Sequence, residues 1–369
     1  MDLYEDMADA RQYLTIDGTF GMVRGQISDP VIAYETWGTL NEKADNAVLI
    51  FTGLSPSAHA ASSSTDPSTG WWEDMVGPGK PIDTKRYFVV CFNSLGSCFG
   101  STGPASINPG TGEKYRLDFP VLCIEDIAKA GNYLLAELGV EVVDTLVGSS
   151  MGGMTALAYT LLFPGTALRL LSCSSAARCQ PFSIALRSLQ RELIRKDPKW
   201  RNGQYPDDAP PEDGMLLARK LGMITYRSAE EWDQRFGRER ATDDISSGTA
   251  GPFGIDFEIE SYLDAHGRKF IGTFDANCYL YLSRAMDLFD ASDHGGSIDK
   301  ALTLTGLQSA HVIGVRSDFL FPPQRQQELA AGLEAGGVKV QFQLLDSIQG
   351  HDSFLIDMDR FRPAIAAFF

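Results

Sequence analysis

Thr145-Leu-Val-Gly-Ser-Ser-Met-Gly-Gly-Met154 is the stretch that best indicates how this chain folds. A short apolar run leads into the pattern G-x-S-x-G at residues 148–152, with Ser150 at its centre. Helix formers follow directly at residues 155–159. Glycines on both sides of a serine permit the close backbone approach of a sharp strand-to-helix turn. Such a turn exposes the serine hydroxyl above the edge of a sheet.

The same pattern also arises by chance in unrelated sequences, because it is short and only partly specified. Its neighbours distinguish the two interpretations, since a strand before the motif and a helix after it are the context that the turn requires. The sequence therefore predicts an enzyme that transfers or hydrolyses an acyl group through a covalent intermediate on Ser150.

The pattern of apolar residues on either side predicts an α/β-hydrolase fold, a mostly parallel sheet with helices on both faces. Residues 31–37 alternate between apolar and polar, as in an antiparallel strand. Near-continuous apolar runs at 46–52, 87–92 and 145–147 are typical of parallel strands covered on both faces. Residues 124–138 have helical spacing and supply a crossover.

The middle of the chain differs, because residues 182–293 are rich in charge and helix formers and contain no good strand run. Strand character returns at 310–315 and 338–345, separated by a helical segment at 323–333, and residues 360–369 resemble a closing amphipathic helix. We therefore expect a core domain of residues 1–181 and 294–369 and a helical lid of residues 182–293.

Composition excludes several classes of partner. The net charge of −16 argues against nucleic acid and against an anionic membrane surface. The six cysteines form no C-x-x-C pair, so no zinc site or redox motif is expected and no metal or cofactor is implied. The acidic first ten residues do not resemble a secretory signal, and no apolar run is long enough to span a membrane. These features predict a cytoplasmic protein with reduced thiols.

A serine hydroxyl needs a base, and the chain contains five histidines. His351 lies in a loop after the last predicted strand and fits the hydrolase order of serine, acid, histidine. Of the remaining histidines, His311 is expected to be structural, and His266 and His294 are expected to be solvated. His59 precedes the serine in the sequence, which is the wrong order for a hydrolase.

The acid is expected between Ser150 and His351, in a loop after a strand. Asp318 follows the strand at 310–315, at an edge where the active-site loops of open α/β sheets gather. Asp346 is the main alternative. For the oxyanion, we expect backbone N–H groups from Met151, after the nucleophile, and from Leu54, after the strand at 46–52.

With these residues placed, the sequence resembles the homoserine O-acyltransferase family nearly from end to end. The resemblance lies in six segments, GWWEDMVGPG at 70–79, FGSTGPASINP at 99–109, GSSMGGM at 148–154, IGTFDANCYL at 271–280, SDFLFP at 317–322 and GHDSF at 350–354. It implies ping-pong transfer from an acyl-CoA co-substrate to the hydroxyl of a small amino acid, and a homodimer formed through the lid. It also implies that Arg219 and Tyr226 bind the amino acid's carboxylate and that Asp352 binds its ammonium group.

Two departures concern the acceptor. The loop Gly53-Leu54-Ser55-Pro56 and the segment at 178–187 differ from the usual homoserine enzymes and are similar to the branch that acylates L-serine for cysteine biosynthesis. A stiffer loop beside the oxyanion donor would shorten the acceptor pocket by one methylene, a change that discriminates about 10- to 200-fold. L-Homoserine, the acceptor in methionine biosynthesis, remains the alternative.

The acyl donor is expected to be succinyl-CoA. Its extra carboxylate needs a cation, and Arg187 at the start of the lid is the candidate. The succinylating homoserine enzymes carry an arginine soon after the triad acid, where this chain has Leu320, so acetyl-CoA stays open. A serine hydrolase acting on an ester or thioester, and a binding protein with a silent site, are the competing interpretations from other classes.

Overall fold

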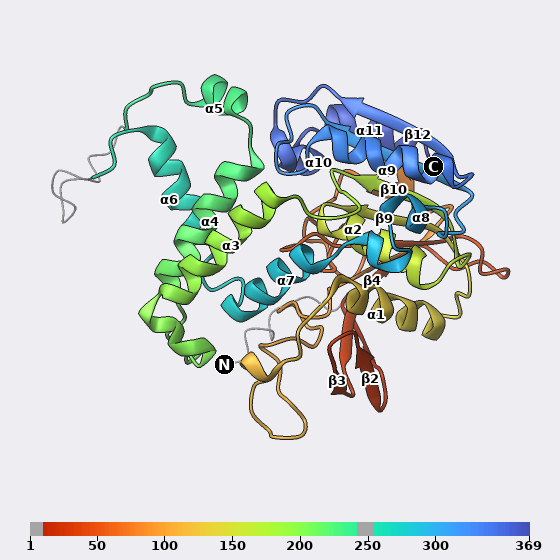
Figure 1. Ribbon diagram of the computed structural model, residues 1–369, viewed down its shortest axis with the longest axis horizontal. Helices are drawn as coiled ribbons and strands as arrows, with labels where there is room; N and C mark the ends of the chain where they lie inside the picture. The colour runs from red at the N-terminus through yellow and green to blue at the C-terminus, as the bar shows by residue number, and fades with distance from the viewer. Residues whose placement is uncertain (1–9, 242–253) are drawn as a thin grey trace.

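The computed structural model describes residues 10–241 and 254–369 (Figure 1). The acidic N-terminal stretch considered for a signal lies, up to residue 9, outside these ranges, as do residues 242–253 of the predicted lid. Within the described ranges, no helix is long and apolar enough to cross a lipid bilayer.

An eight-stranded sheet forms the centre of the described structure, in the order β1-β4-β8-β5-β9-β10-β11-β12. Its strands are β1 (Gln12–Thr15), β4 (Val31–Trp37), β8 (Phe88–Phe92), β5 (Ala47–Phe51), β9 (Val143–Ser149), β10 (Ala167–Cys173), β11 (Ser309–Val315) and β12 (Lys339–Leu345). All neighbours from β8 to β12 run parallel, whereas β4 is antiparallel to both β8 and β1. Two minor sheets pair β2 (Thr19–Met22) with β3 (Gly25–Ser28) and β6 (Val76–Gly77) with β7 (Ile82–Asp83). The predicted fold class is confirmed.

Both faces of the parallel strands are buried, which explains their continuous apolar runs. In β5, Leu49 and Phe51 join one hydrophobic cluster while Val48 and Ile50 join the other. The first cluster is covered by α1 (Ile124–Glu137), α2 (Met151–Leu162), α8 (Ile298–Leu302) and α9 (Pro323–Ala335). The second is covered by α10 (Ser353–Ile356), α11 (Met358–Ala366) and the long segment after β5.

The lid helices follow β10, and those drawn in green and teal in Figure 1 extend away from the sheet. They are α3 (Pro181–Lys196), α4 (Glu212–Tyr226), α5 (Ala229–Arg235), α6 (Glu258–Phe270) and α7 (Ala276–Leu288). Helix α4 packs between α3 and α6, and α7 packs back on α3. Helices α6 and α7 are separate because the chain turns between them at Gly272, which has a φ of +79°. The boundaries of the lid domain at 182 and 293 stay a prediction.

Candidate active site

The turn between β9 and α2 holds Ser150 at φ +54° and ψ −121°, a conformation that non-glycine residues rarely adopt. Both flanking glycines are sterically required. A Cβ on Gly148 would lie 2.1 Å from the carbonyl oxygen of Gly152, and one on Gly152 would lie 2.1 Å from that of Phe51. The turn therefore brings α2 against the end of β5 and leaves the Ser150 hydroxyl above the sheet edge.

The side chains of Ser150, His351 and Asp318 form one hydrogen-bonded chain. His351 Nδ1 lies 2.7 Å from Asp318 Oδ2, and Nε2 lies 2.8 Å from Ser150 Oγ. Because a carboxylate only accepts hydrogen bonds, Nδ1 carries the proton and Nε2 is free to accept one from the serine. Asp318 is fully buried, and its Oδ1 accepts hydrogen bonds from the amides of Leu320 and Phe321. The carboxylate is thus held in a fixed orientation.

Three loops at the carboxyl ends of the parallel strands supply these groups, as expected for an open α/β sheet. Ser150 follows β9, Asp318 follows β11 and His351 follows β12. The ring of Phe321 stacks on the imidazole at a centroid distance of 5.2 Å, which fixes the ring plane. The alternative acid, Asp346, is 80% exposed and pairs with Arg316, so it does not orient His351.

The other histidines lie away from the serine, but not all as expected. His311 is buried in β11, in agreement with a structural role. The expectation that His294 and His266 are solvated is wrong. His294 pairs with Glu125 of α1 at 3.1 Å and is only 19% exposed, and His266 packs on the ring of Tyr262 at 4.0 Å. Helix α1 therefore shields part of the His294 ring, and Tyr262 of α6 shields one side of the His266 ring.

A cavity opens in front of Ser150. Its lining includes the residues assigned to acceptor and substrate binding, Gly53, Leu54, Ser55, Pro56, Arg187, Arg219, Tyr226 and Asp352. Sequence reasoning assigned no role to Trp71, Gln190 and Tyr279, which also line it, although Trp71 and Tyr279 lie in two of the segments that carry the family resemblance. Met151 is the first residue of α2, so its N–H has no partner within the helix. Leu54 follows β5 and lines the same cavity as Ser150, which is compatible with its predicted role as the second N–H donor.

Arg219, Tyr226 and Asp352 form the wall of this cavity on the lid side. The Arg219 guanidinium lies 4.6 Å from the centroid of the Phe270 ring, and its Nε has no hydrogen-bond partner in the described part of the chain. Burial raises the pKa of Asp352, although Arg227, at 3.6 Å, opposes that shift. Arg227 had no sequence signal, because only the fold brings it beside Asp352. This wall therefore offers the Arg219 guanidinium, whose Nε donates no hydrogen bond among the described residues, and the Asp352 carboxylate, whose ion pair with Arg227 is long at 3.6 Å.

Arg187 also lines the cavity, and its guanidinium is already paired with a carboxylate. Its Nε donates to Asp287 of α7 at 2.6 Å, and Arg191 reaches the other oxygen of the same carboxylate at 2.7 Å. Its Nη2 lies 2.8 Å from the sulfur of Cys179, whose pKa burial raises to about 11, so that this thiol is neutral. Two guanidinium groups therefore share one carboxylate, which leaves one positive charge uncompensated.

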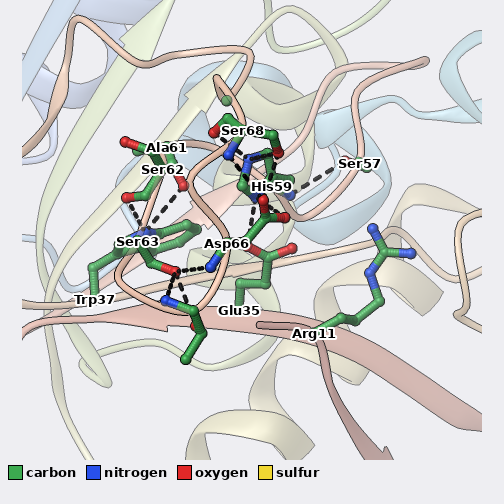
Figure 2. Close-up of polar contacts among 12 residues, drawn as sticks. Arg11, Glu35, Trp37, Ser57, His59, Ala61, Ser62, Ser63, Asp66 and Ser68 are labelled. Atoms are coloured by element: carbon green, nitrogen blue, oxygen red, sulfur yellow. Dashed lines mark hydrogen bonds and ion pairs between the residues drawn. The ribbon is translucent and has the colours of Figure 1, made fainter. Parts of the chain in front are cut away.

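The loop that contributes Leu54 is fastened to β4 by His59 (Figure 2). His59 Nδ1 lies 2.8 Å from the buried carboxylate of Glu35, and Nε2 lies 3.0 Å from the carbonyl oxygen of Ser68. Asp66 is a second carboxylate at 3.6 Å. Because both ring nitrogens face acceptors, the imidazole is best satisfied when it is charged. Farther along, Trp71 donates to the carbonyl of Ser57 at 2.9 Å and closes the loop.

Comparison with known proteins agrees with this geometry. The family model described as alpha/beta hydrolase fold matches residues 46–357. A protein named serine O-succinyltransferase from Litchfieldella anticariensis is 56% identical over 98% of this chain and 99% of its own length. A protein of the same name from Stenotrophomonas maltophilia is 56% identical over 93% of each chain. The chain belongs to the homoserine O-acyltransferase family of α/β hydrolases.

Solved structures extend the similarity to two activities. A homoserine O-acetyltransferase from Bacillus anthracis superimposes with a TM-score of 0.88 at 26% identity, covering 97% of this chain and 96% of that one. The esterase E22 superimposes with a TM-score of 0.87 at 28% identity, covering 98% and 100%. The same fold therefore occurs in a protein named as an acetyltransferase and in one named as an esterase.

Proposed function

We propose that this chain is a serine O-succinyltransferase, which transfers the succinyl group of succinyl-CoA to the hydroxyl of L-serine. The hydrogen-bonded chain of Ser150, His351 and Asp318 carries the proposal, because it ends in a cavity that Arg219 and Asp352 also line. The identity of 56% to serine O-succinyltransferases over nearly the whole chain supports this choice of donor and acceptor.

In the first half-reaction, Ser150 Oγ attacks the thioester carbonyl as His351 Nε2 takes the hydroxyl proton. Asp318 stabilises the imidazolium that forms. The oxyanion accepts hydrogen bonds from the amides of Leu54 and Met151. When the intermediate collapses, the carbon–sulfur bond breaks, His351 returns the proton to the leaving thiolate, and free CoA departs from a succinyl-Ser150 ester.

In the second half-reaction, L-serine binds with its carboxylate on Arg219 and Tyr226 and its ammonium group on Asp352. His351 removes the proton of the substrate hydroxyl, whose oxygen attacks the succinyl ester. The proton then passes to Ser150 Oγ, and O-succinyl-L-serine leaves. Water would give hydrolysis at the same step, so binding of the amino acid decides the outcome.

The uncompensated charge of Arg187, Arg191 and Asp287 supports succinyl as the acyl group. Arg187 is only 5% exposed and lines the cavity, so a terminal carboxylate placed there would be desolvated and paired. An acetyl group would leave this charge unmatched. Because Asp287 neutralises one of the two guanidinium groups, we assign the excess charge to the cluster of Arg187, Arg191 and Asp287 rather than to Arg187 alone.

Two alternatives follow from the structural relatives, an O-acetyltransferase acting on L-homoserine and an esterase or thioesterase. A matrix of succinyl-CoA and acetyl-CoA against L-serine, L-homoserine and water separates them. We expect CoA release to require L-serine and to be fastest with succinyl-CoA. Intact mass spectrometry without acceptor should detect a succinyl adduct that Ser150→Ala lacks. CoA release that ignores both amino acids would instead identify a hydrolase.

The same proposal includes a homodimer formed through the lid. Apolar side chains lie exposed on two lid helices, Phe182 and Leu189 on α3 and Leu217 and Ile224 on α4. Each pair is spaced by seven residues, so its members share one face of their helix. Burial of these faces against a second copy would remove them from water.

A further inference from the structure

A second cavity lies between the lid helices α4, α5 and α6 and adjoins the site described above. Arg219 and Asp352 line both cavities, so the two meet at the wall that holds the amino-acid acceptor. The remaining lining residues come from the lid: Met223, Arg227, Trp232, Tyr262, His266, Lys269 and Phe270. Its volume is about 260 Å³. This is near the lower end for ligand sites, about 300 Å³, so it fits part of a large ligand rather than the whole.

The lining of this lid cavity is cationic although the chain has a net charge of −16. Arg219, Arg227 and Lys269 face a single lining carboxylate, that of Asp352. Arg227 also lies 3.7 Å from Glu231, just outside the lining. In the described part of the chain, no ion pair joins Lys269 to a carboxylate, and its side chain is exposed at the rim. The cavity therefore retains positive charge for an anion from solution.

Aromatic rings form the rest of the walls. Trp232 and Tyr262 meet edge to face at 5.8 Å, and Tyr262 packs on His266 at 4.0 Å. All three rings are only partly buried. Aromatic faces beside cationic groups suit a ligand that combines phosphates with a flat heterocycle, because stacking and charge pairing act together.

We propose that the lid cavity binds the phosphate-bearing end of the CoA thioester, with Lys269 and Arg227 on the phosphates and Trp232 and Tyr262 beside the adjoining part of the nucleotide. This inference rests on the proposed function, which requires a CoA thioester with its carbonyl at Ser150. The donor is a polyanion, and an acidic molecule can hold it only through a local cluster of cations. The cavity that shares its wall with the active site provides that cluster.

The test compares donors with and without the phosphates. Succinyl-CoA and S-succinyl-N-acetylcysteamine present the same thioester, but the second lacks the nucleotide and the diphosphate. For Lys269→Ala, we expect the ratio of kcat/KM for succinyl-CoA to kcat/KM for the short thioester to fall about tenfold, the loss of roughly one charge-assisted contact. Lys269→Arg should restore most of the ratio. Lys300→Ala, an exposed lysine on α8 outside both cavities, should leave it unchanged. An unchanged ratio in Lys269→Ala would overturn the inference.

A binding experiment separates this inference from the proposed function. Calorimetric titration of the wild-type protein with CoA and with adenosine 3′,5′-bisphosphate requires no turnover. We expect both to bind, more weakly at high salt and about tenfold more weakly to Lys269→Ala. If CoA binds in this way but no succinyl transfer to L-serine occurs, the proposed function fails and the lid site stands. If neither compound binds the wild-type protein, the lid site is refuted.

Discussion

Asp352 and Arg219 are charged groups whose partners in this structure are incomplete. The nearest cation to Asp352, Arg227, lies 3.6 Å away, and Arg219 Nε is buried with no partner among the described residues. Burying such groups is unfavourable unless a ligand completes their pairing. A zwitterionic amino acid would supply a carboxylate for one and an ammonium group for the other, so binding relieves a cost already present in the fold.

Replacing Asp352 should affect the acceptor and not the donor. Asp352→Asn is expected to raise the KM for L-serine at least about tenfold, the equivalent of one charge-assisted hydrogen bond. The rate of succinyl-Ser150 formation, followed by mass spectrometry without acceptor, should change little. An equal loss in both half-reactions would mean that Asp352 serves mainly to position the adjacent His351.

The raised pKa of Asp352 also predicts a pH dependence. Burial favours the neutral carboxyl of Asp352. Its protonation therefore begins at a higher pH than that of an exposed aspartate, whose pKa is about 3.9. As the pH falls through that raised pKa, the carboxylate loses its charge and its attraction for the substrate ammonium. We therefore expect kcat/KM for L-serine to decrease at acidic pH through a group that is absent from the profile of Asp352→Asn. Identical profiles would contradict this assignment.

Between β9 and α2, the nucleophile turn depends on contacts with β5. Gly152→Ala would place a Cβ 2.1 Å from the carbonyl oxygen of Phe51, which neither backbone can avoid without moving. We expect a loss of about 3 kcal/mol in the free energy of unfolding, together with loss of activity. Gly21→Ala in β2 is the matched control, because nothing lies within 4 Å of its Cβ, and urea denaturation should show little change. Equal effects of the two variants would refute the steric argument.

The loop after β5 depends on the charged state of His59. Burial lowers the pKa of His59. The hydrogen bonds to Glu35 and Ser68 and the negative charges of Glu35 and Asp66 raise this pKa by more than burial lowers it, so the net shift is upward. Arg11 acts on the same cluster through Asp66 (Figure 2). A folded pKa above the unfolded one means that the stabilisation is complete below about pH 6.5 and disappears as the pH rises through the folded value.

His59→Gln should therefore lower the free energy of unfolding by about 2 kcal/mol near pH 6, and by less at alkaline pH. The same variant should slow formation of succinyl-Ser150, because the loop carries Leu54 and its oxyanion donor. Denaturation curves at several pH values measure the first effect. Parallel stability curves for wild type and variant over the whole pH range would show that the imidazole is not held as a cation.

For the molecule as a whole, exposed apolar faces on the lid predict the oligomeric state. Leu217 and Ile224 are 48% and 47% exposed on α4. We expect the wild type to be a dimer by light scattering and the double variant with Leu217→Glu and Ile224→Glu to be monomeric. Leu304→Glu is the control, since Leu304 is 47% exposed but lies outside the lid helices. A monomeric wild type at micromolar concentration would exclude the lid interface.

Much of the fold could be predicted from the sequence, because it follows from local patterns. The turn at Ser150 needs glycines at fixed offsets, and the buried strands need continuous apolar runs, so neighbouring residues suffice to recognise them. Strand β10 was missed because Arg169 interrupts its apolar pattern. That arginine is accommodated only in the folded state, where it pairs with Asp144 and donates to the carbonyl of Phe368.

The sequence by itself determined the α/β architecture, and it predicted Ser150 as the nucleophile and the chain order of its partners. Only the tertiary structure decided between Asp318 and Asp346, placed Arg227 beside Asp352 and gave Arg187 a carboxylate partner. The hydrogen bond from Ser150 to His351 joins residues 201 positions apart, and that from His351 to Asp318 joins residues 33 apart. Contacts of this kind depend on how the sheet and the lid pack, because no local backbone preference specifies which distant side chain meets a given atom.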